Sequence, residues 1–141
     1  MREIGMSEEE VRELLSKPLI ARIATVGKNL MPNVHPVWFL YDGEFVYVST
    51  AKFSAKVRNV KRNPKVAIVV DVSEKTGNKG VIIRGTAEIV ENEELAKRIL
   101  LKYLSPQDPE FQQLLQIPRV VIKIKPLSIY SWDSSKMFKK A

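Results

Sequence analysis

Short runs of β-branched and apolar residues, separated by turn-forming sequences, restrict the fold of this chain more than any other feature. Residues 19–26 (LIARIATV) lead into the turn-like sequence 27–29 (GKN), and residues 31–40 lead into Asp42-Gly43, a strong hairpin signal. Hairpin turns join antiparallel strands, whereas parallel strands need long crossover connections. The pattern therefore predicts a mainly β, α+β domain built on an antiparallel sheet.

The periodicity of apolar residues predicts six strands and a few short helices. The strands are expected at residues 19–26, 31–40, 44–50, 65–72, 81–90 and 119–132. The helices are expected at 7–16, within 51–63, at 92–103 and around 111–115. Ser7 and Glu10 form a capping box for the first helix, and Ser54 is the expected N-cap of the second. Six strands joined mostly by hairpins imply a β-barrel rather than a doubly wound α/β sheet.

Two prolines, a glycine and a polar stretch refine this expected barrel. Pro32 and Pro36 lack an N–H group, so they suit a sheet edge or a place where a ligand replaces the next strand. Gly85 is expected to mark a bulge. The polar sequence 73–80 (SEKTGNKG) is expected to connect the two strands that flank it.

Cysteine is absent from the 141 residues, and His35 is the only histidine. A disulfide framework, a thiolate zinc site and a cluster of histidines around a metal are thereby excluded, and we expect no metal site. No apolar run approaches the roughly 20 residues that span a bilayer, and the acidic N-terminus does not resemble a signal peptide. We therefore expect a cytoplasmic protein with no membrane partner, with one domain over residues 1–133 and a basic, mobile tail over residues 134–141.

The net charge of +7 is concentrated between residues 52 and 65, a stretch with six basic residues and no acidic one. This stretch includes the sequence Ser54-Ala55-Lys56 at the start of a predicted helix, and it follows Ser49-Thr50 at the end of a predicted strand. Hydroxyl groups, a lysine and the free N–H groups of a helix N-terminus together suit a phosphate group. The alternative interpretation is a simple helix cap beside a solvated basic face.

A basic chain can also bind nucleic acid, and a barrel of the OB type is the corresponding alternative. The basic residues, however, lie mainly on one predicted helix. Stacking of single-stranded bases requires basic and aromatic side chains together on one sheet face, and no such face is evident. We therefore expect no nucleic-acid partner.

Five motifs occur together in the chain. They are the strand end at 24–26 (ATV), Pro32 with the PVWF that follows it, the stretch from Ser49 to Lys56, Asn63-Pro64, and the strand 83–89 (IRGTAEI). Their combination resembles the flavin-binding split-barrel superfamily, which includes pyridoxamine 5′-phosphate oxidase, small FMN-binding proteins and reductases that use a deazaflavin coenzyme. The resemblance implies a six-stranded antiparallel split β-barrel with a few short helices, which forms a homodimer with a flavin at each of two sites in the subunit interface.

The resemblance also implies which residues hold the flavin. The strand His35, Pro36, Val37, Trp38 is expected beneath the isoalloxazine ring, and the phosphate is expected on Ser49, Thr50, Ser54, Ala55 and Lys56. Trp132 is a candidate to pack against the ring from the partner subunit. Two alternatives stay open. His35 contacts the flavin phosphate or ribityl chain or is a structural residue, and each tryptophan contacts the ring or is a core or interface residue.

The expected function is that of an FMN-binding oxidoreductase that exchanges electrons with a small-molecule donor or acceptor. No catalytic side chain is assigned, because hydride chemistry belongs to the flavin. His35 and Ala55 stand where the oxidases have phosphate-binding arginines, and the chain lacks their arginine- and histidine-rich C-terminal segment, so we do not expect a true pyridoxamine phosphate oxidase. The alternatives are a reductase dependent on the deazaflavin coenzyme and a non-catalytic flavin-binding protein.

Overall fold

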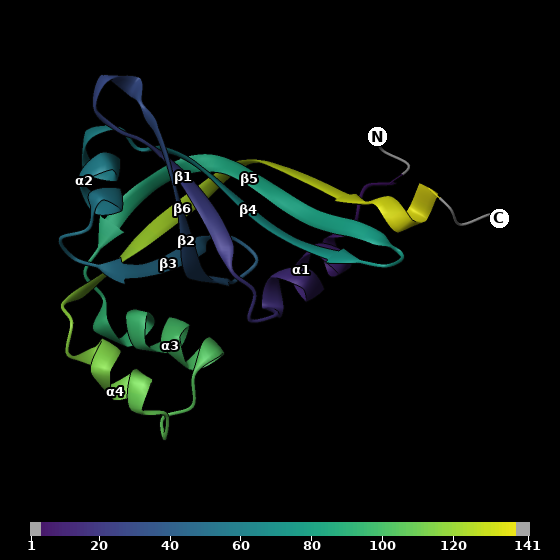
Figure 1. The fold of residues 1–141 in the computed structure, drawn as a ribbon. Helices are drawn as coiled ribbons and strands as arrows, with labels where there is room; N and C mark the ends of the chain where they lie inside the picture. Colours follow the sequence, from purple (N-terminus) through teal and green to yellow (C-terminus); the bar gives the residue numbers. More distant parts are fainter. Residues whose placement is uncertain (1–3, 138–141) are drawn as a thin grey trace.

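Six antiparallel strands close into a barrel in the order β1-β2-β3-β6-β5-β4 in the computed structural model, which describes residues 4–137 (Figure 1). The strands are β1 (Ala21–Val26), β2 (Pro32–Tyr41), β3 (Val46–Ala51), β4 (Lys65–Glu74), β5 (Gly77–Val90) and β6 (Arg119–Asp133). The helices are α1 (Glu8–Ser16), α2 (Ala55–Arg62), α3 (Glu93–Tyr103) and α4 (Pro109–Leu115), with two short 3-10 helices, η2 (Lys28–Leu30) and η3 (Ser134–Met137). The predicted mainly β split barrel is confirmed. Within residues 4–137 no helix has the length and apolar composition needed to cross a membrane.

The hairpin between β4 and β5 is longer than the sequence predicts. The polar stretch 73–80, expected to be a connection, instead continues both strands as far as the pair Glu74 and Gly77. Gly77 has a φ of +139°, a conformation that glycine adopts without steric strain. The extended ends of β4, β5 and β6 form a ribbon that projects beyond the barrel (Figure 1). Strand segments outside the barrel need no apolar face, so apolar periodicity does not mark them.

Alternating side chains of the strands fill the barrel interior, as the period of two requires. Phe39 of β2, Val48 of β3 and Ile122 of β6 are fully buried and belong to one core cluster. Helix α1 contributes Leu14 and Leu15 to the same cluster. The predicted capping box of this helix is confirmed, with both reciprocal hydrogen bonds present. The helix therefore closes one end of the barrel with its apolar face.

Gly85 marks the expected irregularity in the pairing of β5 with β6. The register between these strands shifts between Arg84 and Gly85. A Cβ atom at Gly85 would collide with the backbone carbonyl of Lys125. Only glycine allows this close approach of two backbones, so the prediction of a bulge at Gly85 is confirmed with its steric cause.

Strand β2 changes partner part-way along its length. Residues 32–37 pair with β1, and residues 38–41 pair with β3. The first half of β2 therefore keeps one edge that is not paired with β3. Pro32 and Pro36 lie in this half, which agrees with the expectation that they occupy an edge.

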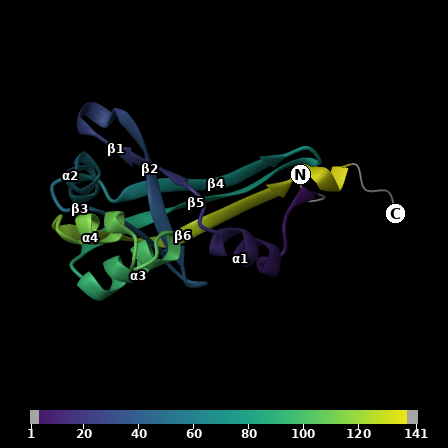
Figure 2. The ribbon, with the colours of Figure 1, turned by 60° about the horizontal axis from the view of Figure 1, so that its bottom comes forward.

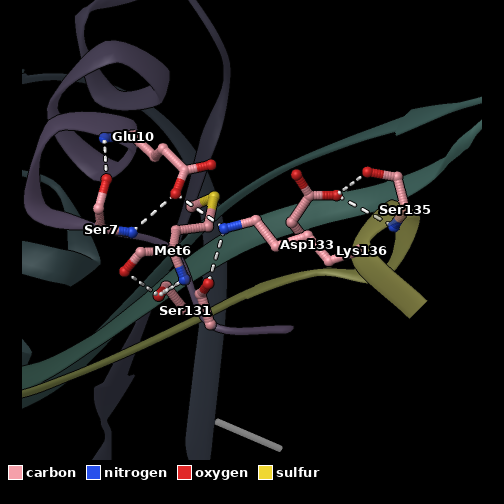
Figure 3. A network of polar contacts seen from close by, with 8 residues as sticks. Met6, Ser7, Glu10, Ser131, Asp133, Ser135 and Lys136 are labelled. Atoms are coloured by element: carbon pink, nitrogen blue, oxygen red, sulfur yellow. Dashed lines mark hydrogen bonds and ion pairs between the residues drawn. The ribbon is translucent and has the colours of Figure 1, made fainter. Parts of the chain in front are cut away.

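The segment before α1 is joined to the end of β6 and to η3 by a polar network (Figure 3). The Met6 backbone N–H donates to Ser131 Oγ at 2.9 Å. Lys136 Nζ donates to the Gly5 carbonyl at 2.9 Å and to Glu10 Oε1 at 2.8 Å. The described part of the predicted tail therefore forms η3 and contacts the first helix, while residues 138–141 lie outside the described residues.

We expect acid to weaken the fold through Glu10. Its pKa is lowered to about 2, because the Lys136 ammonium group and then the Ser7 N–H donate to the carboxylate. A carboxyl whose pKa is lower in the folded chain contributes stability that is complete above its ordinary pKa of 4.5 and is lost as the pH falls toward 2. Urea unfolding of Glu10→Gln should show a loss of about 1 kcal/mol or less at pH 7, because the half-exposed pair is screened, and the loss should shrink between pH 4.5 and 2.

Glu13→Gln is the matched control, since this exposed carboxylate lies on the same helix and forms no ion pair within residues 4–137. A Glu10→Gln effect that is equally large at pH 7 and pH 2 would contradict the assignment.

Candidate functional site

A groove of about 400 Å³ lies beside the point where β2 changes partner. We call it the β2 pocket. Its lining residues are Ile20, Pro36, Val37, Trp38, Ser49, Thr50, Lys56, Glu110, Leu114 and Arg119. The structure thus brings together six of the ten predicted site residues, from β2, the end of β3 and the first turn of α2.

Two of the predicted phosphate contacts, Ser54 and Ala55, lie next to the pocket at the start of α2. Ser54 occupies the N-cap position as expected, but its side chain makes no capping hydrogen bond. Its hydroxyl lies 3.3 Å from the hydroxyl of Thr50 instead. The N–H groups in the first turn of α2 therefore have no side-chain cap. They lie near the hydroxyls of the pocket, and free N–H groups at a helix start can bind an anion.

Two cationic side chains meet in the β2 pocket. Lys56 and Arg119 are both partly buried, and within residues 4–137 neither forms an ion pair. Burial and, second, the charge of Arg119 lower the pKa of Lys56. Burial likewise lowers the pKa of Arg119. Two like charges held together in a partly dehydrated place are stabilised by an anion between them.

Arg119 is a site residue that sequence reasoning missed. Its Nε–H donates to Ser49 Oγ at 2.9 Å, across 70 residues of sequence. The contact follows from the pairing of β3 with β6, in which Ala51 faces Arg119 and Ser49 faces Val121. The sequence does show an arginine at the start of the last strand. Only the pairing of β3 with β6 shows that this arginine lies beside Ser49.

Glu110 and Leu114 of α4 form the wall of the β2 pocket that the sequence did not suggest. They are four residues apart and therefore lie on one face of the helix, while Phe111 is buried and anchors it. Figure 2 shows α3 and α4 together at the end of the barrel that carries β3. The pocket therefore carries two cations at one side and a carboxylate on α4.

His35 lies on the same face of β2 as Val37 and Phe39, toward the barrel interior. Its Nδ1 atom is buried and makes no hydrogen bond with the described part of the chain. Burial first, and then the positive charge of Lys56, lower the pKa of His35. Both causes disfavour the charged imidazole, one of whose polar atoms is unsatisfied, and its contact with a flavin stays a prediction.

Trp38 both lines the pocket and packs against α3. Its ring stacks on Tyr103 with centroids 4.6 Å apart and planes 4° apart. The Tyr103 hydroxyl donates to the Leu19 carbonyl at 2.8 Å and accepts from the Phe39 N–H at 3.2 Å. The last pair of residues between β1 and β2 is Ala21 with Val37. Beyond it, the Tyr103 hydroxyl bridges Leu19 and Phe39 in place of a direct hydrogen bond between the strands. Helix α3 therefore supports the strand that bounds the pocket.

Trp132 does not line the β2 pocket. Its indole N–H donates to Asn78 Oδ1 at 2.8 Å, and its ring lies against Gly80, where a Cβ atom would be 2.6 Å away. Both partners belong to the projecting ribbon, toward the other end of β6 from Arg119. Its role toward a flavin of the partner subunit stays a prediction.

Tyr103→Phe should retain the stacked ring and lose the hydroxyl. The Phe39 N–H and the Leu19 carbonyl would then lack their partner, at a cost of about 1–3 kcal/mol in the free energy of unfolding. Tyr130→Phe is a suitable control, because the Tyr130 side chain is 45% exposed. Chemical denaturation of the two variants checks this, and equal stability of both would show that the Tyr103 hydroxyl does not support β2.

Comparison with known proteins assigns the chain to a protein family. Residues 7–133 match the sequence profile of the pyridoxamine 5′-phosphate oxidase family. The chain belongs to this family. The match spans all six strands of the barrel and every residue that lines the β2 pocket.

Three individual relatives are between 26% and 29% identical to this family member where they align with it. General stress protein 26 of Bacillus subtilis is 29% identical over 93 residues, which cover 65% of this chain and 66% of that protein. A solved structure of a conserved hypothetical protein from Mycobacterium tuberculosis has a TM-score of 0.83 at 26% identity and covers 100% of this chain and 93% of that one. A structure named as an F420 reductase has a TM-score of 0.67 at 28% identity and covers 84% and 94% of the two chains. The split-barrel fold is therefore shared with proteins of different names.

Proposed function

We propose that this family member is a cytoplasmic oxidoreductase that binds FMN in the β2 pocket of a homodimer. The observation that carries the proposal is the meeting of Lys56 and Arg119, without an ion pair among the described residues, beside the hydroxyls of Ser49 and Thr50. A phosphate dianion neutralises two such cations and accepts hydrogen bonds from both hydroxyls and from helix N–H groups.

The residues of the pocket fit the two ends of FMN. Lys56, Arg119 and the uncapped first turn of α2 would hold the phosphate. The ring would lie against the unpaired edge of β2, where Pro36 and Val37 offer an apolar wall. The bound flavin supplies the hydride chemistry. The protein orients it, while His35 lies outside the lining of the pocket, where burial first and then the charge of Lys56 lower its pKa.

Exposed apolar residues on the outer side of β2 support the homodimer. Pro32, Val34 and Pro36 point outward along the strand and are exposed, and Pro36 also lines the β2 pocket. At the preceding turn, Leu30 is 77% exposed and Met31 is 64% exposed. A second copy that covered this stripe would remove it from water and close the open side of the pocket.

Val34→Asp should weaken the dimer at least about tenfold, because a two-fold interface receives the buried charge twice. Sedimentation at several concentrations measures this. Leu101→Asp is the control, since Leu101 is an exposed leucine on α3, away from the stripe. A wild-type protein that stays monomeric, or a Val34→Asp variant with unchanged association, would contradict the assignment of this face.

Two other functions remain as alternatives. The similarity to an F420 reductase favours a reductase that uses this deazaflavin coenzyme. A flavin carrier without turnover is the second alternative. Reduction of the bound flavin by NADH or NADPH, followed by reoxidation with a small-molecule acceptor at a catalytic rate, would separate an enzyme from a carrier.

An absorbance scan of the purified protein and titration with FMN, followed by flavin fluorescence, test the proposal. We expect saturable binding at one FMN per subunit. Lys56→Ala should weaken it by about 1.5–3 kcal/mol, because a charge-assisted phosphate contact is lost. Lys61→Ala removes an exposed charge from the same helix and should leave the dissociation constant nearly unchanged. No flavin binding, or equal affinity of both variants, would refute the phosphate position.

A further inference from the structure

His35 lies at the end of the barrel that α2 covers. On β1 it faces Ile23. The next inward-facing residue of β1, Thr25, accepts a hydrogen bond from Asn59 Nδ2 of α2 at 3.0 Å, and all three of these neighbours are buried and uncharged. Arg62, in the last turn of α2, donates to Asn59 Oδ1 at 3.1 Å. The imidazole therefore has uncharged neighbours on β1, while α2 brings cations to this end of the barrel.

The charge that acts on this imidazole belongs to the β2 pocket. Lys56 of α2 lines the pocket, and its positive charge acts on His35. Arg119 of β6 lines the same pocket and acts in turn on Lys56. Glu110 is the carboxylate of the pocket, but it forms no ion pair with these groups. The three basic groups thus lead from the barrel interior into the pocket, with no carboxylate paired to them among residues 4–137.

The chain by itself disfavours the charged form of His35. Burial first, and then the charge of Lys56, lower the pKa of the imidazole. Both ring nitrogens are donors in the charged form, yet the buried Nδ1 atom has no acceptor within the described part of the chain. Of these causes, the charge of Lys56 is the one that binding in the pocket can change. An anion between Lys56 and Arg119 offsets that charge and so favours the imidazolium.

We propose that His35 takes up a proton when an anion binds between Lys56 and Arg119, so that the site binds its anion more tightly as the pH falls. The inference rests on the anion site of the proposed function and gives that site a pH dependence that arises outside its lining. The linkage is reciprocal, because an anion that favours the charged ring is favoured by that ring to the same extent. If the anion raises the pKa of His35 by about 0.5, its affinity is about threefold higher below both pKa values than above both.

Proton NMR of the untagged protein tests this directly, because the chain has a single histidine. The Cε1–H signal of His35 is followed between about pH 5 and 8, without FMN and with saturating FMN. We expect the titration midpoint to be higher by about 0.5 in the FMN complex. Without FMN, Lys56→Gln should also raise the midpoint, since it removes one cause of the lowered pKa. Lys61→Gln removes an exposed charge from the same helix and should leave the midpoint unchanged.

His35→Gln separates this effect from the phosphate group of FMN, which itself gains a proton near about pH 6. The change in FMN affinity between about pH 8 and pH 5.5 contains both effects in the wild-type protein and only the phosphate effect in the variant. Flavin fluorescence titration at the two pH values should therefore show that acidification favours the wild-type protein about threefold relative to His35→Gln.

The outcomes distinguish this inference from the proposed function. An FMN complex whose His35 midpoint is unchanged or lower would overturn the proton uptake and leave the flavin site intact, as would equal pH dependence of the wild-type protein and His35→Gln. Failure to bind FMN would overturn the flavin site. Sulfate, whose charge is constant over this pH range, then replaces FMN in the NMR titration, and a midpoint that it does not raise would overturn the proton uptake as well.

Discussion

The change of partner along β2 is the constraint on which the site depends. A strand that paired with β1 and β3 along its whole length would leave no edge for a ligand. Here residues 32–37 pair with β1 and residues 38–41 with β3, so each half keeps an edge for other groups. Near Phe39, the edge on the β1 side is occupied by the Tyr103 hydroxyl from α3. Near Pro36 and Val37, the edge on the β3 side borders the β2 pocket. One irregularity of pairing thus creates both the attachment of α3 and the wall of the pocket.

Closure of the barrel places the charges of the site. Ser49 and Thr50 end β3, Lys56 begins α2, and Arg119 begins β6, so these groups meet only because β3 pairs with β6. The arrangement is electrostatically unfavourable by itself, since burial first and then the charge of Arg119 lower the pKa of Lys56. Binding sites commonly retain such local costs, while the surrounding core supplies the stability. In this chain the supporting core is the barrel interior closed by α1.

Much of the fold could be predicted from the sequence, because local signals and tertiary structure agree. Apolar periodicity located the barrel part of every strand, and Gly85 located the bulge. The hydroxyls and Lys56 could be grouped because they lie within one short stretch of chain, and the strand His35, Pro36, Val37, Trp38 was joined to them by the family resemblance. Arg119 and Glu110 could not, since their place in the pocket depends on pairing and packing across long separations. The side chain of Ser54 also differed from its expected role, because its hydroxyl contacts Thr50 rather than capping the helix.

The closeness of Lys56 and Arg119 affects how long the folded protein persists in a cell. An anion that relieves their repulsion binds the folded chain and not the unfolded one, so its concentration adds to the apparent stability, by about 2.7 kcal/mol at 100 times the dissociation constant. Chains that lack the anion would open more often and reach proteases more often. The abundance of the protein would then follow the supply of whichever anion binds between these two side chains, with no dedicated regulator.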